Sequence, residues 1–111
     1  MHEIKPLTEK LFMKFCQCCG YNTISSSPIS FEICEICFWQ NDAFQNENPN
    51  DSGGPNNISL IQAQKNFIQF EACQFEMIVH VRKPNKSEFR SDKFNLFKYS
   101  VALSQAQSDS R

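Results

Sequence analysis

Two pairs of cysteines decide the fold of this chain: Cys16-Gln17-Cys18-Cys19-Gly20 comes first, and Cys34-Glu35-Ile36-Cys37 follows it. A Cys-x2-Cys pair forms a tight turn that lets two sulfurs reach one ion, and two such turns facing each other complete a tetrahedron of thiolates. Fourteen residues separate Cys19 from Cys34, which is enough for a strand, a turn and a returning strand. The spacing therefore predicts a zinc ribbon.

The segment between the two pairs has the composition of a β-hairpin. Residues 21–24 and 29–33 are rich in β-branched and aromatic side chains, and residues 25–28 separate them as a turn of three serines and a proline. Gly20 suits the position after the first pair, because glycine relieves crowding where backbone amides turn toward a thiolate. Phe38 occupies the matching position after the second pair, where a glycine would be easier.

The ligands predicted from this pattern are Cys16, Cys19, Cys34 and Cys37. Cys18 competes with Cys16 for a place in the first pair, and we favour Cys16 and Cys19 because a two-residue gap closes a relaxed chelate turn. Zinc is the expected ion, one per chain. Iron fits the same all-sulfur tetrahedron, so it stays open as an alternative.

Disulfide bonds and a redox dithiol are the other interpretations of six cysteines in a short chain. Residues 1–15 contain no long apolar core after a basic start, so we expect no secretory signal and a cytoplasmic protein whose thiols stay reduced. No segment approaches about 18 apolar residues in a row, so we expect no membrane span. These observations favour the metal site.

Helix signals are clearest at Ser59-Leu60-Ile61-Gln62, because the Ser59 side chain can accept from the Gln62 amide while the Gln62 side chain returns to Ser59. An apolar face follows at helical spacing: Leu60, Ala63, Phe67 and Phe70. Strand-like composition occurs at residues 11–15 and 75–81, a long irregular loop is expected at 46–57, and apolar side chains recur at near-helical intervals over 86–99. Two single residues are predicted to have packing roles: Cys73 as a buried free thiol and His80 as a half-buried strand residue.

The predicted fold class is α+β. Residues 1–85 would form a small zinc-ribbon-like β-hairpin domain with one main helix packed on it. Residues 86–111 would form a C-terminal extension that begins as a helix and ends as a disordered tail.

Charge is unevenly distributed along the chain, although the formal net charge is −1. Residues 16–81 carry seven acidic side chains against one lysine, a net charge of −6, and four thiolates on a divalent ion would make this region more negative. Residues 82–111 carry seven basic and three acidic side chains, a net charge of +4. The metal-bearing region is therefore acidic, which disfavours nucleic acid as its partner.

Four motifs follow one another in order: Cys16-Gln17-Cys18-Cys19-Gly20-Tyr21; Glu32-Ile33-Cys34-x2-Cys37-x-Trp39-x2-Asp42; Gly53-Gly54-x-Asn56-x2-Ser59-Leu60-x2-Ala63-x2-Asn66-Phe67; and Val81-Arg82-x-Pro84. Together they resemble the small bacterial cysteine-rich proteins called the CPCC family. Two departures are Gln17, where the family name expects proline, and Gln40-Asn41, where acidic residues usually follow the tryptophan. Some proteins similar to this family are associated with polymorphic toxin systems as immunity proteins, so the resemblance implies a role of that kind.

The favoured function is a non-enzymatic, zinc-stabilised immunity protein that neutralises a cognate toxin domain. An acidic surface would steer such a protein toward the basic, phosphate-binding surface of a nuclease. The candidate partner-binding residues are Trp39, Asp42, Glu47 and Asp51.

Three other functions remain as alternatives. A nucleic-acid-binding zinc ribbon would rely on the basic residues and phenylalanines of residues 82–98. A metal-stabilised adaptor would use an unknown partner. An enzyme is disfavoured, because four cysteine ligands leave no open coordination position for water. The sequence predicts neither the partner nor the oligomeric state.

Overall fold

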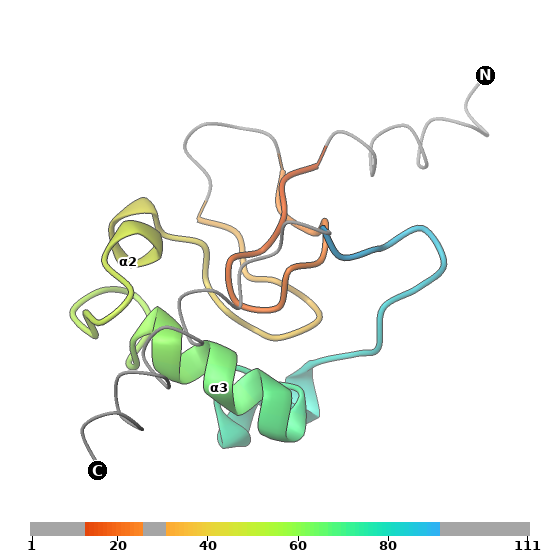
Figure 1. Cartoon of the computed structure of the whole chain (residues 1–111). Helices are drawn as coiled ribbons and strands as arrows, with labels where there is room; N and C mark the ends of the chain where they lie inside the picture. The colour runs from red at the N-terminus through yellow and green to blue at the C-terminus, as the bar shows by residue number, and fades with distance from the viewer. Residues whose placement is uncertain (1–12, 26–30, 92–111) are drawn as a thin grey trace, which may run out of the picture.

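The computed structural model describes residues 13–25 and 31–91 of the chain. Three short helical elements occur within these ranges: α2 (Ala43–Glu47), α3 (Leu60–Phe70) and the 3₁₀ helix η2 (Phe75–His80). α2 lies beside the N-terminal end of α3, and η2 lies below its C-terminal end (Figure 1). No helix of the described part is long and apolar enough to span a membrane.

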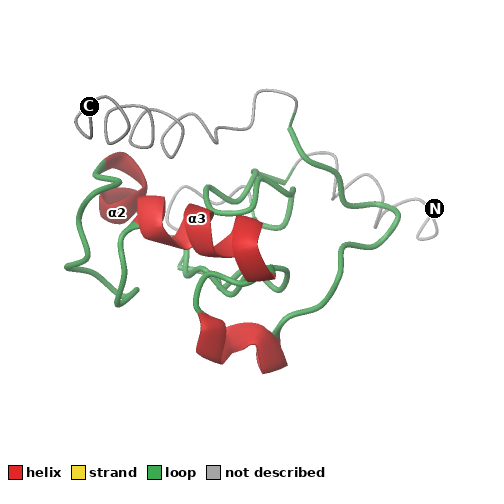
Figure 2. Ribbon diagram, turned by 60° about the horizontal axis from the view of Figure 1, so that its bottom comes forward, coloured by secondary structure: helices red, strands yellow, loops and turns green. Residues whose placement is uncertain are grey.

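The predicted β-hairpin is not present as a ladder in the described residues. Loops connect the helices there, and β pairing is confined to three isolated antiparallel bridges (Figure 2). Two of these bridges flank the cysteine pairs, because Lys14 pairs with Ile24 and Ile33 pairs with Gln40. Each cysteine pair turns the chain sharply, so the segments before and after the pair form a single bridge and do not continue as paired strands. Residues 26–30, at the centre of the expected hairpin, lie outside the described residues, as do residues 11 and 12 of the strand expected before it.

α3 begins where the sequence predicts. Ser59 is its N-cap, and the Ser59 hydroxyl accepts a hydrogen bond from the Gln62 amide at 3.1 Å. The reciprocal half of the expected capping box is absent, because the Gln62 side chain donates to Asn66 Oδ1 at 2.8 Å instead. Leu60 and Ala63 are fully buried against the cysteine cluster. The predicted apolar face of the helix thus attaches α3 to the cysteine-bearing loops.

The strand predicted at residues 75–81 is wrong, because residues 75–80 form η2. β-branched composition favours a strand only where a neighbouring strand supplies hydrogen-bond partners. The hydrogen bonds of this segment are local instead, such as the bond from Met77 N to Gln74 O at 2.9 Å. Residues three apart share a face of a 3₁₀ helix. Met77 packs against the core, and the His80 ring stacks on Phe38 with centroids 5.2 Å apart. His80 is therefore an exposed helix residue and not a half-buried strand residue.

α2 is a helix that the sequence analysis missed, and its last two residues fall inside the loop predicted at 46–57. Asp42 is its N-cap and accepts from the Gln45 amide at 3.0 Å, so Asp42-x-x-Gln45 is the sequence signal that could have located it. Residues 48–57 are irregular, as predicted.

The helix predicted over residues 86–99 does not begin where expected, since residues 86–91 form a turn followed by extended chain. This segment packs back on the first cysteine pair: Tyr21 bridges with Arg90, and Phe89 N donates to Asn22 Oδ1 at 2.9 Å. Residues 92–111 lie outside the described residues. The chain thus contacts the cysteine-bearing region as far as Ser91, whose amide donates to Gly20 O at 3.3 Å.

Candidate metal centre

Two similar turns, which we call knuckles, carry the four cysteines: residues 16–20 and residues 34–38. In the first, Gly20 N donates to Cys16 O at 2.8 Å, and in the second Phe38 N donates to Cys34 O at 2.7 Å. Both knuckles end on a residue with left-handed backbone, Gly20 at φ 88° and Phe38 at φ 73°. Glycine adopts this conformation without strain, whereas a side chain costs about 1 kcal/mol or more. Phe38, at the position where the sequence analysis expected a glycine to be easier, therefore has a strained left-handed backbone.

The knuckles bring four sulfurs together, those of Cys16, Cys19, Cys34 and Cys37, all within 4.8 Å of one another. Cys16 Sγ lies 3.6 Å from Cys37 Sγ, and Cys19 Sγ lies 3.7 Å from Cys34 Sγ. For metal–sulfur bonds of about 2.3 Å, the edge of a regular tetrahedron is about 3.8 Å. The two short sulfur–sulfur distances match that edge, so the donor set fits a zinc ion.

The four cysteines are fully buried, each with 0% of its surface exposed. Burial raises the pKa of the Cys16 and Cys37 thiols, whereas hydrogen bonds from Cys16, Cys19 and Cys37 lower the pKa of Cys34. Several thiolates crowded into a buried site repel one another and lose solvation. A bound dication removes this penalty, because it neutralises the ligands that it holds.

Other segments hold the first knuckle in place. Gln64, fully buried on α3, donates from Nε2 to Gln17 O at 2.8 Å. Arg90 donates from Nε to Cys19 O at 2.8 Å, and its guanidinium lies over the Tyr21 ring at 5.2 Å from the centroid. The first cysteine pair is therefore fixed by α3 on one side and by the segment before Ser91 on the other.

The second knuckle is fixed by the chain that follows α3. Cys73 N donates to Cys37 O at 2.7 Å, and Arg82 N donates to Glu35 O at 3.2 Å. The Arg82 guanidinium forms a bidentate ion pair with Glu88, with both N–O distances at 2.7 Å. It also donates a hydrogen bond to the Glu35 carboxylate at 2.9 Å. The Glu88 side chain is fully buried. This pair joins residues 82–88 to the metal centre.

Comparison with models of known protein families assigns this chain to a family. The family described as cysteine-rich CPCC matches residues 14–88, about two thirds of the chain. This chain belongs to the cysteine-rich CPCC family. No curated protein and no solved structure matches it.

Gln17 stands where the CPCC name expects proline, and the structure shows that the contact at this position is made by the backbone. Gln64 binds the carbonyl of Gln17, which any residue would provide. Cys18 is buried as well, but its sulfur is not part of the group of four. Among the three cysteines that compete in this CPCC knuckle, Cys16 and Cys19 are the ones placed to share an ion with the second pair.

One of the four residues predicted to bind a partner, Trp39, does not lie at the surface. Trp39 is fully buried and donates from Nε1 to Asn46 Oδ1 at 3.1 Å, so it packs in the core and offers no surface to a partner. Asp42 caps α2, and Asp51 accepts from Gly53 N. Glu47 is exposed, and it lines a shallow hollow of about 330 Å³ together with residues 48–51.

Three residues that support the CPCC metal centre were not singled out from the sequence: Thr23, Gln64 and Arg90. Thr23 Oγ1 lies 3.0 Å from Cys34 Sγ. Gln64 and Arg90 bind backbone carbonyls from positions 47 and 71 residues away in sequence. Contacts of such long range leave no local pattern, so only the folded structure reveals them.

Proposed function

We propose that this protein is a non-enzymatic, metal-stabilised binding protein, and that its partner is a cognate toxin domain which it neutralises as an immunity protein. Cys16, Cys19, Cys34 and Cys37 would hold one zinc ion in a structural role. Four cysteine ligands leave no open coordination position for a substrate or for water, which supports a structural ion over a catalytic one. The reduced thiols that such a site needs support a cytoplasmic location.

The observation that carries this proposal is the set of exposed apolar side chains on α3 and η2, which we call the apolar face; two of them, Ile68 and Ile78, line one hollow. Its exposed side chains are Ile68 at 52%, Phe75 at 68%, Ile78 at 39% and Val79 at 82%. Exposed apolar groups that gather in one place are typical of sites that bind other proteins. A partner that covered this face would remove them from water.

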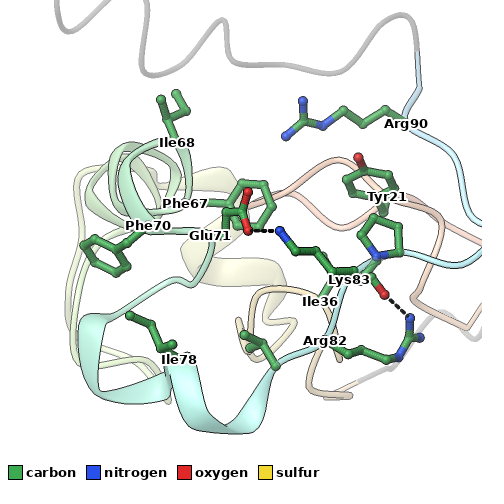
Figure 3. Close-up of a pocket in the computed structure, with 12 residues that line it drawn as sticks. Tyr21, Ile36, Phe67, Ile68, Phe70, Glu71, Ile78, Arg82, Lys83 and Arg90 are labelled. Carbon is green, nitrogen blue, oxygen red and sulfur yellow. Dashed lines mark hydrogen bonds and ion pairs between the residues drawn. The ribbon is translucent and has the colours of Figure 1, made fainter.

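The apolar face borders a hollow of about 560 Å³ between α3, η2 and the segment after η2 (Figure 3). Ile36, Phe67 and Ile78 are among the apolar residues that line it. The ion pair between Lys83 and Glu71, with an N–O distance of 2.6 Å, crosses one side of the hollow. Both of these side chains are largely exposed, so a partner could displace the pair at a cost of about 1 kcal/mol or less. The hollow is thus suited to receive an apolar side chain from a partner.

Charge supports a basic partner. Residues 16–81 carry a net charge of −6 before any thiolate is counted, of which Arg82 and Lys83 offset part through their ion pairs with Glu35 and Glu71. A field of this sign accelerates encounter with a basic surface, such as the phosphate-binding surface of a nuclease toxin. In this proposal the acidic region steers the partner, and the apolar face provides the contact.

The experiment measures binding to the product of the adjacent gene, which the proposal expects to be the cognate toxin, with growth rescue as the cellular readout. Ile78→Asp places a charge at the edge of the hollow that Ile78 lines, and should weaken binding at least tenfold. Phe44→Asp is the matched control, because Phe44 is an exposed apolar residue of α2, at the opposite end of α3. Equal binding by both variants, or no binding by the wild type at micromolar concentration, would contradict the proposal.

The same measurement separates the alternatives. Binding to an unrelated protein at the same face would make the chain an adaptor. Salt-sensitive binding to DNA or RNA would favour the nucleic-acid-binding alternative. That alternative is weakened by the ion pairs of Arg82 and Lys83, which already hold acidic groups of the chain.

A further inference from the structure

The two knuckles differ in the groups that reach their sulfurs. Cys34 Sγ lies 3.0 Å from the Thr23 hydroxyl and accepts from Ile36 N at 3.4 Å. In the part of the chain that the structure describes, these are the hydrogen bonds that non-cysteine groups make to the four sulfurs, and both end on Cys34. The Ile36 bond follows from the shape of the knuckle, but the Thr23 bond comes from another segment.

The backbone around Thr23 is fixed on both sides. Thr23 N donates to Tyr21 O at 2.9 Å, and the next residue, Ile24, exchanges two backbone hydrogen bonds with Lys14, at 2.7 and 3.1 Å. Ile24 itself is buried in the core. In the folded chain these contacts hold Thr23 beside Cys34, so the bond to sulfur needs no further ordering of this segment.

The direction of this bond is determined by the protonation state of the sulfur. A metal-bound thiolate carries no proton, so the threonine hydroxyl must be the donor. The hydroxyl has one other acceptor within reach, Tyr21 O, but that oxygen is 3.5 Å away, compared with 3.0 Å for the sulfur. Hydrogen bonds to an ionised acceptor are about twice as strong as those between neutral groups.

We propose that Thr23 is a positioning residue for the metal centre: its hydroxyl donates to the Cys34 thiolate, holds that ligand in place and slows release of the ion. Four thiolates and one divalent ion leave an excess of negative charge in a buried site. The Thr23 bond takes up part of this charge at Cys34, so the loaded state is stabilised over the free one. This inference depends on the metal centre alone and needs no assumption about the partner.

Thr23→Val and Thr23→Ser form the test pair. Valine has nearly the shape of threonine but no hydroxyl, whereas serine keeps the hydroxyl and loses a methyl group. Loss of a group that orients a metal ligand typically lowers metal affinity about 10- to 100-fold. We expect Thr23→Val to bind zinc about 10- to 100-fold more weakly in competition with a chromogenic chelator and to release it faster, while Thr23→Ser stays within about threefold of the wild type.

Cobalt provides a second readout that does not depend on affinity. A hydrogen bond to a coordinated sulfur lowers the energy of its electrons, so its removal should shift the sulfur-to-cobalt charge-transfer band of Thr23→Val to longer wavelength. The band of Thr23→Ser should not move. The proposal is overturned if Thr23→Val matches the wild type in both readouts. It is also overturned if serine and valine weaken binding equally, because the methyl group and not the hydroxyl would then be responsible, or if the wild type binds neither metal.

Discussion

The loop between α2 and α3 depends on one buried glutamine, and its removal is the most informative test of this part of the fold. Gln45 is fully buried, and its Nε2 donates to Asp51 O and Ile58 O, both at 3.0 Å, and to Asn56 O at 3.4 Å. Its Oε1 accepts from Asn56 N at 3.1 Å and from Asn56 Nδ2 at 2.9 Å. One side chain therefore provides the hydrogen bonds that a helix or sheet would supply elsewhere.

Gln45→Met removes these bonds and nearly preserves side-chain volume. Each hydrogen bond contributes about 1 kcal/mol net, and a buried group left unpaired costs about 1–3 kcal/mol. Nε2 has two hydrogens, so the longer contact to Asn56 O shares one of them, and four full bonds are lost. The loop should be destabilised by about 4 kcal/mol, which is large beside the total stability of a small domain. The cysteine cluster and α3 have their own contacts, so we expect the loss to appear as local opening of residues 48–58 while the ion is retained.

Amide hydrogen exchange, followed by mass spectrometry on zinc-loaded protein, measures this opening directly. Peptides from residues 48–58 should exchange at least about 100-fold faster in Gln45→Met, and those from the knuckles should be unchanged. Gln69→Met is the matched control, since Gln69 is an exposed glutamine of α3. Gly54→Ala should act in the same direction, because the added Cβ would lie 2.7 Å from Gln45 Cδ and Oε1. Wild-type protection in Gln45→Met would refute the reasoning, and loss of zinc would refute its local character.

Further predictions concern the metal and its surroundings. Zinc removal by a chelator, or Cys37→Ser, should unfold the chain, because a structural zinc contributes on the order of 10 kcal/mol; metal analysis and circular dichroism check this. Gly20→Ala should lower the free energy of unfolding of the zinc-loaded protein by about 1–2 kcal/mol, since Gly20 has φ 88°. Glu88→Gln should lower it by about 1–3 kcal/mol in denaturant titration, less than for a wholly buried pair because the Arg82 side chain is 37% exposed. Burial raises the pKa of Cys73 to about 12, so its thiol should resist iodoacetamide at neutral pH until the chain unfolds, which mass spectrometry of the labelled protein checks. The contribution of this raised pKa to the free energy of unfolding is fully present below about pH 9 and is lost as the pH rises toward 12.

The parts of the fold that could be predicted from the sequence are those in which nearby residues determine the geometry. A Cys-x2-Cys pair folds into a knuckle through hydrogen bonds between residues four apart, so its spacing alone located Cys16, Cys19, Cys34 and Cys37. The same holds for the start of α3, where Ser59 reaches an amide three residues ahead. Such signals are strong because no other part of the chain has to be placed first.

The parts that failed depend on a distant partner. Composition at residues 75–81 favoured a strand, but a strand needs a neighbouring strand to pair with, and no segment among residues 13–25 and 31–91 pairs with this one. Residues 86–91 looked helical, yet Arg90 is held by Cys19 O and by its bridge to Tyr21. Trp39 was a candidate for partner binding as well as for packing on a knuckle, and it is fully buried; the sequence of an irregular loop does not show which of its side chains face the core. Local patterns carry no information on these contacts.

The composition of the core connects the metal to the proposed binding face. Six of the twelve buried apolar residues in the described part of the chain are cysteines, and the others include a single aromatic residue, Trp39. The described part of the core buries little hydrocarbon, so an ion held by the four cysteines would supply a large share of the free energy that stabilises it. Large side chains such as Phe75 and Val79 are then not required inside, and they remain exposed. In the proposed function, a metal ion in place of a larger hydrophobic core would leave these apolar residues available for a partner, which would explain why a four-cysteine cluster and exposed apolar side chains occur together.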